Sequence, residues 1–369
     1  MFSENNKISV RQIQALIITY FLGVNATILP RIASEYVGHN AWLAVAVSAV
    51  LAGAGAYLCV TSVMLYRGKV SLHDILCFAF SSFVGKIACV VLTAYFTLLA
   101  ALKLRIFGEI VAAYLLPQTP LWQVAALMLF LAFFASFHGV ETKSRASEIL
   151  VFIVVVPLII LIFFGIFSAD FSNLLPITQV SGSDILIGGF ESGFVFTGLP
   201  FLLVIVPMLA VGGAISRRRI LGSFAFLSAL LIVVTMLCVS VLGVSSVLNS
   251  RHPFLELLFV INIPGSFMER QNALVLSFLI LTVFITITVL TCCGTVLLRD
   301  TFATGKRRNY CYILLAAIFT VTLLISTENQ AIEFMQTIYR YTTPIFVFAL
   351  PVLLILAARF KSKKLRHEE

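Results

Sequence analysis

Charged residues are scarce in this chain, and that scarcity excludes most soluble folds. Only 11% of the 369 residues are charged, whereas 60% are hydrophobic; in an average soluble domain about a quarter of residues are charged. Lipid accepts so much apolar surface, provided that backbone polar groups pair inside helices or a closed barrel. The apolar runs are continuous rather than alternating, which argues against a barrel. We therefore expect one all-α membrane domain spanning residues 1–369.

Sequence signatures of catalysis are also missing. No P-loop, no H-E-x-x-H and no G-x-S-x-G motif occurs, so we do not expect an enzyme. The seven cysteines lie in or beside apolar segments without metal-type spacing, so neither a metal nor a cofactor is predicted. The polar start, Met1 to Gln12, leads into a long apolar run, and we expect no cleaved signal peptide.

Runs of about 20 apolar residues are long enough to cross a bilayer as helices. Five such runs in each half predict about ten transmembrane helices, near 12–36, 41–66, 85–116, 121–138, 146–168, 185–212, 219–247, 272–299, 310–326 and 335–360. An odd number per half makes the halves insert in opposite senses, as 5+5 inverted repeats. We expect a first repeat over about 8–168, a second over about 185–360 and a cytoplasmic tail over 361–369.

Two shorter segments do not cross. Residues 71–82 are amphipathic and are predicted to lie along the cytoplasmic surface, whereas 253–263 predict an extracytoplasmic helix that caps the bundle. Basic residues indicate the orientation of the chain, because they concentrate in cytoplasmic loops. If the N-terminus is cytoplasmic, 19 of the 25 basic residues fall in cytoplasmic loops and tails. Both termini are therefore predicted to be cytoplasmic. Because the basic residues are spread over six segments and not gathered on one soluble face, they do not indicate nucleic-acid binding.

The first and sixth predicted spans are both interrupted by residues that weaken a helix. The first contains Gly23, Val24, Asn25, Ala26 and Thr27, followed by Pro30. The sixth contains Gly188, Gly189, Glu191, Gly193, Thr197, Gly198 and Pro200. Matched breaks predict discontinuous helices 1 and 6 with a binding site between them, where freed amides attract a carboxylate and freed carbonyls a cation. The alternative is that these residues merely permit kinks and close helix contacts.

The third span carries charge at Lys103, Arg105 and Glu109. Arg105 and Glu109 are four residues apart, so they share a helix face and can pair. One interpretation gives these charges a role at the ligand; the other is an internal salt bridge with Lys103 extending to the outer interface.

The eighth span is rich in threonine, and three glutamates lie near span ends. Most hydroxyls of Thr282, Thr286, Thr288 and Thr291 are expected to bond to their own helix, with one or two facing a ligand. The glutamates, each expected to be solvated, are not predicted to relay protons; they are Glu148, Glu191 and Glu269.

Several stretches, in order along nearly the whole chain, resemble the B subunits of spore germinant receptors, which belong to the amino acid/polyamine/organocation transporter superfamily. These stretches are KISVRQ at 7–12, LGVNATILP at 22–30, LRIFGEI at 104–110, PQTPLW at 117–122, RASEIL at 145–150, DFSNLLPITQVSGSDILIGG at 170–189, HPFLE at 252–256 and FMERQNAL at 267–274.

The resemblance implies a receptor subunit in the inner membrane of a bacterial cell or spore. Such a subunit binds a small nutrient, often an amino acid, and signals germination together with an A-type membrane subunit and a C-type lipoprotein subunit. Carried onto this chain, the family's pocket comprises Gly23 to Thr27, Leu98, Ala101, Arg105, Phe196, Thr197, Gly198, Leu199, Thr288 and Cys292.

Two other functions remain open at this point. An amino acid transporter driven by sodium or protons would use the same pocket, although the fifth span lacks the lysine that some proton-coupled relatives carry there. If the chain is a purely structural subunit of an assembly, filling the pocket has no effect.

Overall fold

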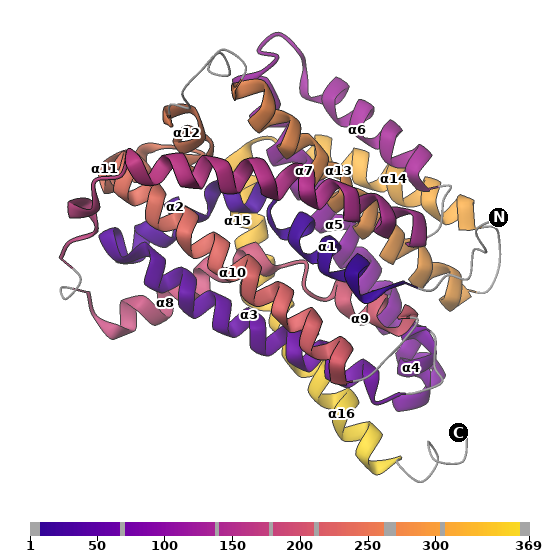
Figure 1. The fold of residues 1–369 in the computed structure, drawn as a ribbon. Helices are drawn as coiled ribbons and strands as arrows, with labels where there is room; N and C mark the ends of the chain where they lie inside the picture. The colour runs from indigo at the N-terminus through magenta and orange to yellow at the C-terminus, as the bar shows by residue number, and fades with distance from the viewer. Residues whose placement is uncertain are drawn as a thin grey trace.

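The computed structural model describes residues 8–66, 71–136, 140–176, 180–209, 214–261, 271–302 and 307–361. These residues are almost entirely helical, and the one β-bridge among them joins Ile8 to Leu209. Glu269 and the tail over 362–369 lie outside the described residues. The long helices pack side by side into one bundle (Figure 1).

The first half of the chain contains α1 (Val10–Phe21), α2 (Val24–Val37), α3 (Ala41–Met64), α4 (Leu72–Ala79), α5 (Ser82–Tyr114), α6 (Leu121–Ser136) and α7 (Val140–Phe167). The second half contains α8 (Gly182–Ser192), α9 (Phe201–Ile205), α10 (Ala214–Leu242), α11 (Val244–Asn249), α12 (Pro253–Val260), α13 (Gln271–Phe302), α14 (Arg307–Leu324), α15 (Glu328–Thr337) and α16 (Leu350–Phe360). Between α15 and α16 run two π-helical segments, η6 (Ile338–Thr342) and η7 (Ile345–Ala349).

Each predicted span coincides with one helix or with several consecutive helical segments. Among the described residues, six helical segments are long and apolar enough to cross a membrane: 24–64, which contains both α2 and α3, 82–114, 144–167, 215–242, 277–302 and 328–360. A seventh candidate is the sixth predicted span, which is bent by 42° at its break, and shorter apolar helices cover 121–135 and 308–324. The chain is therefore an all-α, multi-pass membrane protein, whereas its division into two inverted repeats at the stated residues stays a prediction.

Local sequence signals set several helix ends. The Ser9 hydroxyl accepts a hydrogen bond from the Gln12 backbone amide, and the Gln12 side-chain oxygen accepts one from the Ser9 backbone amide, which forms a capping box at the start of α1. Gly38 ends α2 with φ +53°, a conformation that favours glycine. The short helices α4 and α12 lie where the sequence predicts a surface helix and a capping helix.

The two ends of the bundle carry different elements. The start of α1, the end of α16 and helix α4 lie toward one end of the molecule, whereas α11 and α12 lie toward the other (Figure 1). Helices α5 and α13 pack closely against one another in the interior, and α1 and α2 lie beside them. The discontinuous first span therefore lies beside the two long central helices, with α1 against α13 and α2 against both.

Candidate functional site

The first span is discontinuous at Leu22 and Gly23, as predicted. The Leu22 amide still donates to the Ile18 carbonyl at 3.1 Å, and α2 starts afresh after Gly23, whose backbone is extended. No side chain caps the start of α2, and the Ala26 amide turns back to the Gly23 carbonyl at 3.0 Å. Helix α2 therefore begins at a buried position with first-turn amides that no side chain caps.

The sixth span is interrupted by a tighter helix. After α8, the 3₁₀ segment η3 (Gly193–Phe196) leads through Thr197 to Pro200 into α9. Here amides donate to the carbonyl three residues earlier, Thr197 to Phe194 at 3.2 Å and Leu199 to Phe196 at 3.0 Å. Pro200 has no amide hydrogen to offer. The prediction of discontinuous helices 1 and 6 is confirmed.

Asn25 joins the two breaks directly. Its side-chain amide, 2% exposed, donates to the carbonyls of Phe194 at 3.3 Å and Val195 at 3.4 Å, and the Phe194 carbonyl also accepts from the Thr197 amide. Its carbonyl oxygen Oδ1 has no hydrogen-bond partner among the described residues. One asparagine therefore satisfies main-chain groups of the sixth span from the start of α2 and keeps an unused acceptor beside them.

A second tie comes from the third and tenth spans. The buried hydroxyl of Tyr95 donates to the Thr197 carbonyl and lies 3.0 Å from Oγ1 of Thr343. The Thr197 hydroxyl has no partner within the described part of the chain. Sequence reasoning missed Tyr95, because one tyrosine in an apolar helix carries no pattern that distinguishes it from a packing residue.

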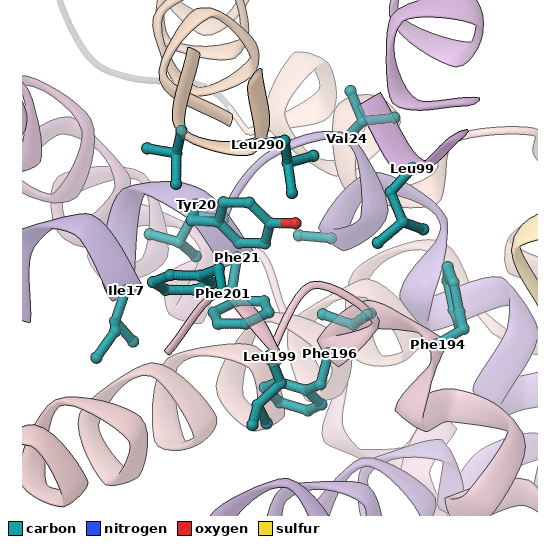
Figure 2. Packing of buried hydrophobic residues seen from close by; sticks show 14 of the residues in the cluster. Ile17, Tyr20, Phe21, Val24, Leu99, Phe194, Phe196, Leu199, Phe201 and Leu290 are labelled. Carbon is teal, nitrogen blue, oxygen red and sulfur yellow. The ribbon is translucent and has the colours of Figure 1, made fainter. Parts of the chain in front are cut away.

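Tyr20 fills the space between the breaks. Its side chain is 1% exposed and its ring lies 4.8 Å from that of Phe21 and 5.0 Å from that of Phe201, centre to centre. A Cβ at Gly198 would lie 1.8 Å from the Tyr20 hydroxyl oxygen, so only glycine fits there. Figure 2 shows Tyr20 lying among Phe21, Phe201 and the segment that carries Leu199. The predicted pocket is therefore occupied by a side chain of the protein itself.

Lys103 lies over the ring of that tyrosine. Its Nζ lies 4.2 Å from the ring centroid of Tyr20, and the residue is 3% exposed. The alternative in which Lys103 extends to the outer interface is wrong, because the ammonium group stays inside the bundle. A cation over an aromatic face is an attractive contact that is stronger away from water.

Arg105 pairs with Glu109, as the spacing predicts, and turns away from the breaks. Its Nη2 donates to Oε1 of Glu109 and, at 2.8 Å, to the carbonyl of Ser326, just before α15. Arg105 is one of the residues expected in the pocket. Its contacts link the outer part of α5 to the tenth span instead.

The helical phase of α5 differs from the expectation at Leu98 and Ala101. Leu98 is 37% exposed and so faces away from the interior, and the Ala101 carbonyl accepts from Thr322 of α14 at 3.2 Å. The face toward the breaks carries Tyr95, Leu99 and Lys103 instead.

The eighth span approaches the first break with other threonines than Thr288. A Cβ at Gly23 would lie 3.7 Å from the hydroxyls of both Thr282 and Thr286, and Thr286 lies 3.4 Å from the Tyr20 carbonyl. Thr288 donates to its own helix, to the Phe284 carbonyl at 2.6 Å. Cys292 lines a cavity of about 10 Å³ with Leu16 of α1 and other apolar side chains.

A larger cavity lies beside the sixth break. It measures about 60 Å³ and is lined by Phe196 and Leu199 of the break, by Tyr339 and Thr343 of the tenth span, and by α3. Phe196 and Leu199 thus separate this cavity from Tyr20 and Phe21.

Two further polar contacts involve residues close in sequence to the breaks. Thr27 hydrogen-bonds to the Val24 carbonyl at 2.7 Å and to Nδ1 of His252 at 3.1 Å. Glu191, expected to be solvated, is 6% exposed and lies 2.6 Å from Nη2 of Arg340, because the bend in the sixth span directs it toward the tenth. No group of three His, Cys, Asp or Glu side chains that could hold a metal occurs within the described ranges.

Known proteins resemble this chain over nearly its full length. Spore germination protein YndE of Bacillus subtilis is 24% identical over 98% of this chain and 99% of its own. Spore germination protein KB of the same organism is 24% identical over 98% and 97%, and GerQB of Bacillus cereus is 27% identical over 71% of each chain.

Solved structures of transporters share the fold. Two mutants of a manganese transporter from Eremococcus coleocola superpose with TM-scores of 0.57 and 0.58, cover 95% of this chain and 78% of theirs, and are 12% and 13% identical. At that identity the likeness shows a transporter-like membrane fold. The family model described as spore germination protein matches residues 7–331, and the chain therefore belongs to the spore germination protein family.

Proposed function

We propose that this protein is the B-type subunit of a germinant receptor, that it binds a small nutrient, an amino acid, between the two broken helices, and that it signals spore germination with partner subunits. Membership of the spore germination family supports the biological role. The observation that carries the binding site is the meeting of both breaks at Asn25, around the side chain of Tyr20.

An amino acid matches what the breaks offer. The uncapped start of α2 presents amide hydrogens and the positive end of a helix dipole to a carboxylate. The carbonyl oxygen of Asn25 and the hydroxyl of Thr197 are unused and can accept from an ammonium group. The proposed activity is binding and signalling, with no bond made or broken.

Signalling follows from differential binding. A ligand shifts a protein between two packings only by the difference in its affinity for them. The bent sixth span and the two π-helical segments of the tenth span are irregular elements that can repack around a ligand. We propose that an A-type membrane subunit and a C-type lipoprotein subunit read this change in the inner membrane, with both termini of this chain cytoplasmic.

Equilibrium binding to the purified protein in lipid nanodiscs tests this proposal, with a panel of amino acids and nucleosides. Gly23→Ala meets only ordinary contacts at 3.6 to 3.7 Å and is expected to keep binding, whereas Gly23→Trp fills the space beside Thr282 and Thr286 and is expected to abolish it. Gly182→Trp is the control, because nothing lies within 4 Å of a Cβ there. Binding that survives Gly23→Trp would place the ligand elsewhere.

The second candidate function is secondary transport of amino acids, driven by sodium or protons. The transporter-like fold favours it. Uptake of radiolabelled amino acids into proteoliposomes separates the two: the receptor predicts binding without concentrative uptake under either ion gradient, and sustained accumulation would favour the transporter.

A further inference from the structure

Lys103 is a buried cation without a counter-ion within the described parts of the chain. Its Nζ lies over the Tyr20 ring, and the residue is 3% exposed. Glu109 and Glu191 each pair with an arginine, Glu109 with Arg105 and Glu191 with Arg340. A charge in a membrane-spanning segment is costly, so such residues mark ligand or ion pathways when they have no structural partner.

The Tyr20 side chain fills the space between the breaks, but its hydrogen-bonding group is poorly satisfied there. Its hydroxyl has no hydrogen-bond partner among the described residues and faces the bare backbone of Gly198. Its ring is held by Phe21, Phe201 and Lys103, contacts that are weak one by one. Figure 2 shows the ring reaching from the end of α1 toward the sixth-span segment. A ligand that satisfied the polar groups around it would compete well for this space.

Lys103 and the start of α2 present positive charge beside the same side chain. Tyr20 lies three residues before Gly23, where α2 begins without a side-chain cap, and α2 packs against α5, the helix that carries Lys103. Ammonium groups and helix N-termini both favour anions, and their hydrogen bonds to a carboxylate are charge-assisted.

We propose that the ligand of this protein carries a carboxylate, that Lys103 anchors it, and that Tyr20 leaves the space between the breaks when the ligand enters. This inference rests on the proposed function and adds to it the residue that holds the carboxylate and the side chain that the ligand displaces. Phe201, Leu199 and Phe21 form the apolar remainder of the space, so the ligand's other groups are small or apolar.

Paired probes that differ only at the carboxylate test the anchor. Binding of L-alanine, L-valine and glycine to the full-length protein is compared with binding of L-alaninamide, L-valinamide and glycinamide. The acids are expected to bind about tenfold or more tightly, the usual size of an interaction between charged groups. Lys103→Met is expected to remove this preference, Lys103→Arg to keep part of it, and Lys86→Met, an exposed lysine on the same helix, to leave it unchanged.

The outcomes separate this inference from the proposed function. Amides that bind as well as acids, or an acid preference that survives Lys103→Met, would overturn the anchor while the binding site stands. If only nucleosides bind, the carboxylate class is wrong although a germinant site exists.

A second measurement tests Lys103 even if no panel member binds. Tyr20→Ala empties the space beside the ammonium group, which acetate is small enough to enter. Acetate is expected to raise the melting temperature of Tyr20→Ala above its value in equal acetamide, and to have no such effect in Tyr20→Ala/Lys103→Met. Equal melting temperatures of Tyr20→Ala in acetate and acetamide would contradict the anchor.

Discussion

His252 and Glu328 form a buried contact that joins two segments far apart in sequence: Nε2 of the imidazole lies 2.8 Å from Oε1 of the carboxylate. The two residues are 2% and 7% exposed. The other ring nitrogen of His252 lies 3.1 Å from the Thr27 hydroxyl. This chain of three side chains connects α2, the residue before α12 and the first residue of α15. The outer half of the first span is thereby coupled to the tenth.

Breaking this contact is expected to destabilise the bundle. Glu328→Gln takes the carboxylate away from the imidazole and His252→Ala takes the imidazole away from the carboxylate; a buried polar group that loses its partner costs about 1–3 kcal/mol. Thermal unfolding in detergent should show a clearly lower melting temperature for both, whereas Glu333→Gln, an exposed change on the same helix, should not. Equal melting temperatures for all three variants would mean that the contact adds nothing to stability.

Asn25 is expected to couple the two breaks. Asn25→Ala removes the side-chain donor from the Val195 carbonyl, whereas the Phe194 carbonyl keeps the Thr197 amide; an unsatisfied buried polar group costs about 1–3 kcal/mol. We expect a lower melting temperature together with weaker ligand binding. Thr320→Ala is the control, because its hydroxyl is exposed and bonds only to its own helix. If Asn25→Ala binds the ligand as tightly as the unmodified protein does, ligand binding does not require the hydrogen bonds of Asn25 between the two breaks.

The pair of Glu191 and Arg340 is expected to hold the sixth span against the tenth. Arg340→Gln leaves the buried Glu191 carboxylate without its partner, whereas Glu191→Gln leaves an arginine that is half exposed. The first change should therefore destabilise the protein more than the second. A double-mutant cycle read by thermal unfolding measures the coupling, and a cycle that is simply additive would refute it.

Cys77 reports the orientation of the chain. It is partly exposed on α4, whereas the other six cysteines are buried. An impermeant maleimide should label it in inside-out vesicles and not in right-side-out vesicles; the reverse pattern would invert the predicted topology. Burial, and next the nearby Asp74 carboxylate, raise the pKa of the Cys77 thiol. The thiolate is the reactive form. Labelling of Cys77 should therefore speed up only at a pH above the one at which an ordinary thiol ionises.

The positions of both breaks could be predicted because glycine and proline disrupt helices locally. The helical phase of α5 could not, because apolar residues surround most of this helix and no polar stripe fixes which face is inside. The resemblance to the family points to Leu98 and Ala101, whereas Leu99 and Lys103 lie on the face of α5 toward the breaks.

Contacts that depend on tertiary structure were also out of reach. Nothing in the sequence shows that Tyr20 needs a bare glycine at 198, since 177 residues separate the two and only the meeting of the breaks brings them together. The pairing of Glu191 with Arg340 likewise needs the bend in the sixth span.

The most direct test of the binding site is a high-resolution structure of the protein with the amino acid that binds best in the panel. Ligand density is predicted between Gly23 and Gly198, with its carboxylate at Lys103 and the Tyr20 ring turned out of that space. Density elsewhere, with Tyr20 still packed between Phe21 and Phe201, would contradict the site.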